Sequence, residues 1–165
     1  MRRWKNGVLL FAAGIIAGHF FTGPTQAQDD RLTGLKLNHV GIYAKDWDET
    51  LNFYIKTMGF KEVFTFKDKD GNVTTSYIQM SKNDFIEVAK TPPGSAPGVS
   101  HIGIWVDDLN ATVAKLRKRG IKVDDVRIGN SKAPLTNMTD PNGVRFELLE
   151  YPPDSLQKKA IDSFR

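Results

Sequence analysis

In this chain, apolar and polar residues alternate over several short stretches, as in β-strands. Two other stretches have the period of a helix. Residues 37–43, LNHVGIY, alternate and predict a β-strand. Asp46 can cap a following helix, which Gly59 ends. The apolar face of this helix comprises Trp47, Leu51, Tyr54 and Met58. Three more strands are expected, at residues 61–66, 73–80 and 84–90. The first half of the pattern therefore predicts a β-α-β-β-β unit.

The second half of the chain repeats the first at an offset of about 62 residues. His39 corresponds to His101, Gly41 to Gly103 and Asp46 to Asp108; one residue is then lost, and Gly59 corresponds to Gly120. The expected elements are strands at residues 99–106, 121–126, 133–139 and 144–151, and a helix marked by Leu109, Val113 and Leu116. A linker rich in proline and glycine, residues 91–98, joins the two units. The chain therefore contains an internal duplication.

A single β-α-β-β-β unit has a curled sheet with a helix on one face, so its other face needs a partner. We predict an α+β fold in which two βαβββ units pair into a cupped, eight-stranded mixed sheet with the helices outside. The domain is expected to span residues 37–151, with units at 37–90 and 99–151. Residues 28–36 would form a linker before it, and residues 152–165 a tail with a short helix over 155–163 that covers the surface.

The first 27 residues have the pattern of a secretory signal peptide. Arg2, Arg3 and Lys5 precede an apolar stretch that is too short to span a bilayer, and Thr25 and Ala27 are the small residues expected before a cleavage site. The chain has no cysteine, which excludes a lipoprotein anchor and thiolate chemistry. We therefore expect a periplasmic or secreted protein that does not associate with a membrane after cleavage.

Removal of this leader changes the charge balance. The whole chain has 23 Lys and Arg against 19 Asp and Glu, but three of the basic residues and none of the acidic ones lie in the leader. The remaining chain carries 20 basic and 19 acidic residues, a net charge of +1. It also lacks a basic run with interleaved aromatic residues. We therefore expect no nucleic-acid partner.

Two histidines and two glutamates occupy matching places in the two units. His39 and His101 lie in the first strand of their units, and Glu87 and Glu147 interrupt apolar last strands. A single strand histidine is usually a half-buried side chain with a satisfied hydrogen bond, and a single glutamate is usually a rim residue that faces water. A buried carboxylate, however, needs a partner or a metal. Duplication would bring the four side chains around one pseudo-twofold axis, a mixed N/O site suited to one divalent ion of Zn, Ni, Co, Mn or Fe(II).

The segments LNHVGIYAKD, LNFYIKTMGF, SHIGIWVDDL and DPNGVRFELLE resemble the vicinal oxygen chelate (VOC) superfamily. This group includes glyoxalase I, methylmalonyl-CoA epimerase, extradiol dioxygenases and the fosfomycin- and bleomycin-resistance proteins. The resemblance extends from about residue 37 to 150 and implies a glyoxalase-like fold. It places the family's metal ligands on the same residues, His39, Glu87, His101 and Glu147. It also leaves open a homodimer, because members build the site within one chain or exchange units between two.

The complete ligand set most resembles glyoxalase I and its isomerase relatives. The resemblance implies a lyase or isomerase acting on a small substrate with adjacent oxygens, with Glu147 as the base and Glu87 as its counterpart. No glutathione-binding signature is recognisable, and export would separate the protein from that thiol, so a different substrate is expected. Two alternatives remain: an Fe(II) extradiol-type dioxygenase, whose relatives usually lack an acid equivalent to Glu87, and a non-catalytic protein that binds a small molecule such as an antibiotic.

The strand period also suggests which side chains line the pocket. Tyr43 shares a face with His39, Trp105 with His101, and Arg145 with Glu147. These three residues are the predicted substrate contacts, and Tyr77 and Gln79 are candidates for the wall. Arg145 would favour an anionic substrate, although it could also extend outward from the rim. The aromatic residues could also belong to the core.

Overall fold

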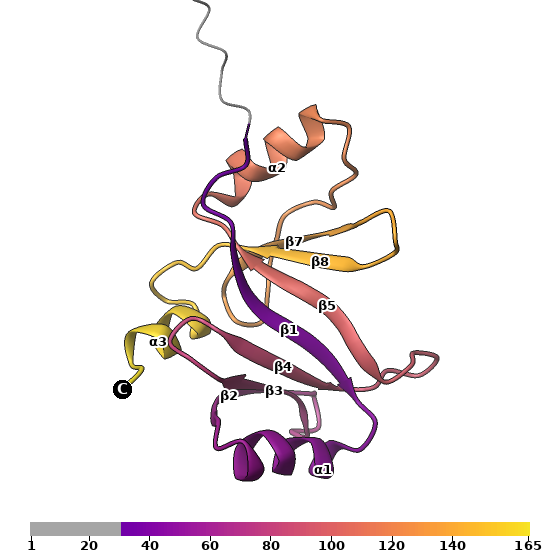
Figure 1. Cartoon of the computed structure of the whole chain (residues 1–165), viewed down its shortest axis with the longest axis vertical. Helices are drawn as coiled ribbons and strands as arrows, with labels where there is room; N and C mark the ends of the chain where they lie inside the picture. The colour runs from indigo at the N-terminus through magenta and orange to yellow at the C-terminus, as the bar shows by residue number, and fades with distance from the viewer. Residues whose placement is uncertain (1–30) are drawn as a thin grey trace, which may run out of the picture.

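The computed structural model describes residues 31–165, so the predicted signal peptide lies outside the described residues (Figure 1). Its first unit contains β1 (Lys36–Ala44), α1 (Trp47–Asn52), η1 (Phe53–Thr57), β2 (Lys61–Lys67), β3 (Val73–Gln79) and β4 (Phe85–Lys90). Its second unit contains β5 (Gly98–Trp105), α2 (Leu109–Lys118), β6 (Arg127–Ile128), β7 (Pro134–Thr139) and β8 (Arg145–Leu149), followed by α3 (Leu156–Asp162). Within residues 31–165, no helix is long and apolar enough to cross a membrane.

The strands form one eight-stranded sheet in the order β2-β3-β4-β1-β5-β8-β7-β6. The two first strands, β1 and β5, pair antiparallel at its centre, and each also pairs in parallel with the last long strand of its own unit, β4 or β8. The two units thus meet around an approximate twofold axis between β1 and β5, and the sheet curls strongly on either side of them (Figure 1). The predicted fold class is confirmed.

Helices α1 and α2 cover the outer face of the sheet at its two ends (Figure 1). Asp46 and Asp108 cap them, each accepting a hydrogen bond from the backbone N–H three residues ahead at 2.8 Å. The apolar side chains of α1 pack on a cluster that contains Ile78 and Val88, and those of α2 pack around Leu148. The first helix differs from the prediction at its end, where η1 forms a π-helical turn and Met58 is exposed.

The third helix is buried more deeply than the sequence indicated. We expected it to be a surface cover, but Ala160 and Ile161 belong to the same buried cluster as Phe85 and Leu149. Those two strand residues lie on the sheet face that also carries Glu87 and Glu147, because alternate residues of a strand share a face. Helix α3 therefore packs against the concave face and closes one end of the cup.

The strand predicted at residues 121–126 is wrong. The structure has only an isolated bridge between Val123 and Met138, followed by the short strand β6. Around this bridge, Arg117 donates to the carbonyls of Val123 and Asp124, and Thr136 also donates to that of Asp124. Of the apolar residues in this segment only Val123 is buried, whereas Ile121 and Val126 are exposed, so the segment does not pair as a regular strand.

Candidate metal centre

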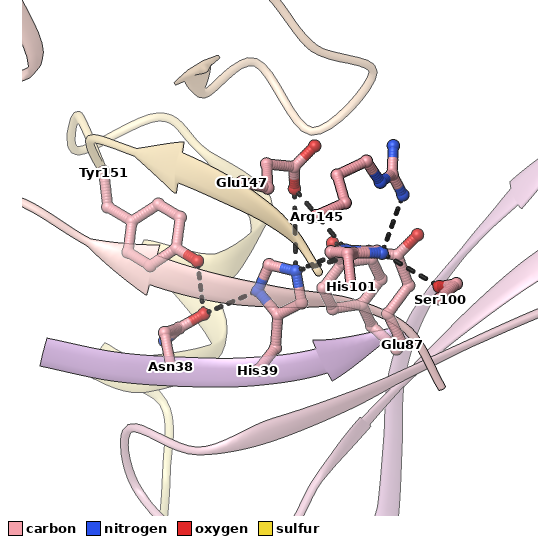
Figure 2. A network of polar contacts seen from close by, with 9 residues as sticks. Asn38, His39, Glu87, Ser100, His101, Arg145, Glu147 and Tyr151 are labelled. Carbon is pink, nitrogen blue, oxygen red and sulfur yellow. Dashed lines mark hydrogen bonds and ion pairs between the residues drawn. The ribbon is translucent and has the colours of Figure 1, made fainter. Parts of the chain in front are cut away.

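The two repeated histidines and the two glutamates converge on one point of the concave face (Figure 2). Nε2 of His39 lies 2.9 Å from Nε2 of His101. Oε2 of Glu87 lies 3.6 Å and 3.4 Å from the Nε2 atoms of His39 and His101, and Oε2 of Glu147 lies 3.5 Å and 3.9 Å from them. All four come from one chain, so this cluster does not require an exchange of units between two chains.

These separations fit a shared metal ion. Ligand atoms at about 2.1 Å from one ion lie about 3.0 Å apart in an octahedral arrangement and about 3.4 Å apart in a tetrahedral one. The four histidine–carboxylate distances range from 3.4 to 3.9 Å, and all four donor atoms lie within 4.8 Å of one another. The cluster is also largely buried, where unpaired carboxylates are costly. The ligand role of the four residues stays a prediction.

The repeated spacing of histidine and glycine has a steric cause. Gly41 pairs with His101 across the two central strands, and Gly103 pairs with His39. A β-carbon on Gly41 would lie 2.1 Å from the His101 ring, and one on Gly103 would lie 2.0 Å from the His39 ring. Each unit therefore supplies one histidine to the cluster and one glycine that makes room for the histidine of the other unit.

Each histidine also has a partner at its second nitrogen, supplied by the residue just before it. Nδ1 of His39 lies 3.2 Å from Oδ1 of Asn38, and Nδ1 of His101 lies 2.9 Å from Oγ of Ser100. Tyr151 donates a hydrogen bond to the same oxygen of Asn38 (Figure 2). For His39, an Nδ1–H bound to Asn38 leaves on Nε2 the free lone pair that a metal ligand requires. The same tautomer of His101, with Nδ1–H donated to Ser100, requires Arg145 to give up its own contact with that Nδ1.

The sequence analysis missed Asn38 and Ser100, because neighbouring residues in a strand normally point to opposite faces. Asn38 is buried and curls back beside His39 while its amide donates to the carbonyl of Asn83 at 2.7 Å. The signal that could have identified the pair is the repeat itself, since Asn38 and Ser100 occupy equivalent positions.

The two carboxylates are held differently. Tyr77 lies opposite Glu87 across β3 and β4 and donates a hydrogen bond to its Oε2 at 2.6 Å. Burial raises the pKa of Glu87, but the hydrogen bond from His101, the charge of the two rings and the Tyr77 hydroxyl outweigh it and hold this pKa at about 2. Burial, together with the two nearby carboxylates, raises the pKa of Tyr77 well above its usual value, so Tyr77 remains a donor.

Glu147 has no such partner. The residue opposite it, across β7 and β8, is Asn137, and no hydrogen bond joins the two. Among the described residues, the close polar contacts of the Glu147 carboxylate are those with the two histidines. The duplicated scaffold therefore presents one carboxylate that accepts a hydrogen bond from a tyrosine and one whose close polar contacts, among the described residues, are the two histidines.

The three predicted substrate contacts lie in different places. Arg145 is at the cluster, with Nη2 2.8 Å from Nδ1 of His101. Trp105 packs on Tyr151, with ring centroids 5.3 Å apart. Tyr43 lines a shallow hollow beside α1 together with Phe53. Of the two wall candidates, Tyr77 reaches the cluster, whereas the Gln79 amide donates to the carbonyls of Lys82 and Ala160.

This curled sheet with a His-Glu-His-Glu cluster on its concave face defines a class of proteins, and the comparison with known families agrees. The family model for the glyoxalase/bleomycin resistance protein/dioxygenase superfamily matches residues 38–134. The chain belongs to this superfamily, which confirms the resemblance drawn from its motifs.

Individual relatives include both lyases and epimerases. The chain is 31% identical over 142 residues to a probable chloroplastic lactoylglutathione lyase of Arabidopsis thaliana, covering 76% of this chain but only 40% of that relative. It is 26% identical to a probable lactoylglutathione lyase of Vibrio parahaemolyticus, covering 70% of this chain and 90% of the relative. Among solved structures, methylmalonyl-CoA epimerase of Streptomyces coelicolor in complex with 2-nitronate-propionyl-CoA is similar, with a TM-score of 0.58, 27% identity, and coverage of 70% of this chain and 96% of that one.

Proposed function

We propose that the protein is a metal-dependent lyase or isomerase of the glyoxalase type, acting on a small substrate with two adjacent oxygens. The observation that carries this proposal is the convergence of two imidazoles and two carboxylates on one point, with donor separations that suit a single divalent ion. The similarity to lyases and to an epimerase supports it. His39, Glu87, His101 and Glu147 would hold the ion, which the donor types limit to Zn, Ni, Co, Mn or Fe(II).

The two carboxylates would divide the chemical work. A divalent ion held here would supply Lewis acidity toward an oxygen of the substrate and so make the adjacent C–H bond more acidic. Glu147, whose carboxylate has no hydrogen bond equivalent to that from Tyr77, would take the proton from that carbon and return it to the product. Glu87 would stay in place, because the Tyr77 hydroxyl binds its Oε2.

Proton exchange with solvent tests this function without knowledge of the natural substrate. A panel of α-hydroxycarbonyl compounds would be incubated with the protein in D₂O and followed by NMR for deuterium at the alpha carbon. Exchange that requires both the protein and a divalent ion supports the proposal. Oxygen consumption with catechols and Fe(II), without exchange, would instead indicate a dioxygenase using His39, His101 and Glu147 as a facial triad. Stoichiometric binding with neither reaction would indicate a sequestering protein.

We also propose that the protein is exported, on the basis of the basic, apolar and small-residue order of residues 1–27. The mature protein should then begin at or near Gln28. Expression of the full-length gene in a bacterial host, followed by fractionation and N-terminal sequencing, checks this. An intact Met1 on soluble cytoplasmic protein would contradict it.

A further inference from the structure

The concave face has two unlike halves, although the duplication makes their positions equivalent. An offset of 60 residues relates Glu87 to Glu147, and the same offset relates Phe85 to Arg145 and Tyr77 to Asn137. In the first unit these positions are aromatic and buried. Phe85 and Tyr77 belong to the cluster that also contains residues of α3. In the second unit they are polar and only partly buried.

The polar half contains a pocket that adjoins the candidate metal centre. It is lined by Lys122, Asp124, Asn137, Met138, Thr139 and Arg145. Asn137, Thr139 and Arg145 share the face of Glu147 by strand period. Val123 bridges to Met138 and packs on the outer cluster, so its neighbours Lys122 and Asp124 lie toward the concave side. We call this the Arg145 pocket.

Two features connect the Arg145 pocket to the cluster. Arg145 reaches His101 at 2.8 Å, and Asn137 lies directly opposite Glu147. A group bound in the Arg145 pocket could therefore belong to the same small molecule whose oxygens lie at the cluster. Helix α3 closes the end of the cup at Phe85, and no helix within residues 31–165 covers the equivalent position at Arg145.

The lining favours an oxyanion. Two cations, Arg145 and Lys122, outnumber the one carboxylate, Asp124. A guanidinium binds a carboxylate or phosphate through two parallel hydrogen bonds. Oδ1 of Asn137 is buried and has no hydrogen-bond partner among the described residues, so it is an acceptor available to a hydroxyl or N–H group on the same ligand.

The contact between Arg145 and His101 adds a second reason. A guanidinium only donates, so this contact requires an Nδ1 without a proton. A neutral His101 that binds a metal through Nε2 must carry its proton on Nδ1, where Oγ of Ser100 is the acceptor at 2.9 Å. Arg145 would then lose its acceptor on His101 and be available to an anion.

We propose that the Arg145 pocket binds a carboxylate or phosphate group of the substrate, and that Arg145 and Lys122 select small anionic compounds with two adjacent oxygens. This inference rests on the proposed function, because it assumes that the adjacent oxygens lie at the candidate metal centre. The inference specifies the class of substrate. The substrate would be a hydroxy or oxo compound that also carries a carboxylate or phosphate group, separate from its two adjacent oxygens.

A series of hydroxamates tests the Arg145 pocket. Acetohydroxamate chelates a metal through two adjacent oxygens, and ω-carboxyalkyl hydroxamates of increasing chain length add a carboxylate. Affinities for the metal-loaded protein would be measured by titration calorimetry at low ionic strength. At least one carboxylated compound should bind about tenfold to a hundredfold more tightly than acetohydroxamate, the range that charge-assisted hydrogen bonds provide. Arg145→Gln should abolish this ratio, and Lys122→Gln should reduce it.

The repeat supplies a matched control. Lys61 is the equivalent of Lys122 in the first unit and lies on the opposite edge strand, so Lys61→Gln should retain the full ratio. If acetohydroxamate binds but no carboxylated compound binds more tightly, or if the advantage survives in Arg145→Gln, the Arg145 pocket is not the anion site and the proposed function still stands. If the protein takes up no metal and binds no hydroxamate, the proposed function fails, and this inference fails with it.

Discussion

Replacement of His39 or His101 with alanine should remove most of the bound divalent ion and leave the fold intact. Each substitution removes one nitrogen donor from the cluster. The loss in affinity should exceed the roughly 10–100-fold that typically follows the loss of an outer hydrogen-bond partner. Elemental analysis after dialysis against a defined metal concentration measures occupancy, and circular dichroism checks the fold. Full occupancy in both variants would exclude the proposed ligand set.

Glycine substitutions provide a second test of the metal site, in which all four proposed ligand side chains are retained. A β-carbon at residue 103 would lie 2.0 Å from the His39 ring, so Gly103→Ala must displace that ring and should weaken metal binding. Gly59 is the control. Its φ is +73° and nothing lies within 4 Å of a β-carbon built there. Gly59→Ala should cost about 1–2 kcal/mol of folding free energy from backbone strain and leave metal occupancy unchanged.

Much of this architecture could be predicted because the sequence contains two copies of one β-α-β-β-β unit. The two histidines occupy the same place in the first strands and the two glutamates the same place in the last strands, so the repeat predicted that all four surround a common axis. The strand period can be read from the sequence alone and predicts the strands. The repeat can be read in the same way, and it predicts that the two units pair and that the four side chains converge.

The features that the sequence did not predict depend on contacts between distant segments. The tail helix contains enough polar residues to suggest a surface cover, and only the position of Phe85 and Leu149 shows that Ala160 and Ile161 close the cup. The strand predicted at residues 121–126 is reduced to a bridge at Val123, because Ile121 and Val126 are exposed, and the sequence period alone did not show this. The hydrogen bond from Tyr77 to Glu87 follows from cross-strand register, which the sequence left open.

The differences between the two units make the two carboxylates of the site, and the two halves of the cup, chemically unlike. A perfect duplication would hold both carboxylates alike and line both halves of the cup alike. Here Tyr77 donates a hydrogen bond to Glu87, whereas Asn137, the equivalent of Tyr77, donates none to Glu147. The repeated positions therefore supply the four residues of the cluster, and the positions where the repeat breaks distinguish its two carboxylates.

That asymmetry leads to the prediction with the largest expected effect on activity. Glu147→Gln keeps an oxygen donor at the cluster but removes the base, so metal should be largely retained. Deuterium exchange at the alpha carbon should slow by about 10²–10⁴-fold, the range typical for loss of a general base. The measurement is the exchange rate per bound metal ion in D₂O, for any compound that the unaltered protein exchanges.

Glu87→Gln is the matched control, because it makes the same chemical change at the equivalent position of the other unit. The Tyr77 hydroxyl donates a hydrogen bond to the Glu87 carboxylate, so Glu87 is held in place as a metal ligand and is less able than Glu147 to swing toward a substrate carbon. Glu87→Gln should therefore lower metal affinity while the exchange rate per bound ion falls much less than in Glu147→Gln. Equal losses per bound ion in the two variants would show that neither carboxylate alone is the base, and a larger loss in Glu87→Gln would assign that role to Glu87.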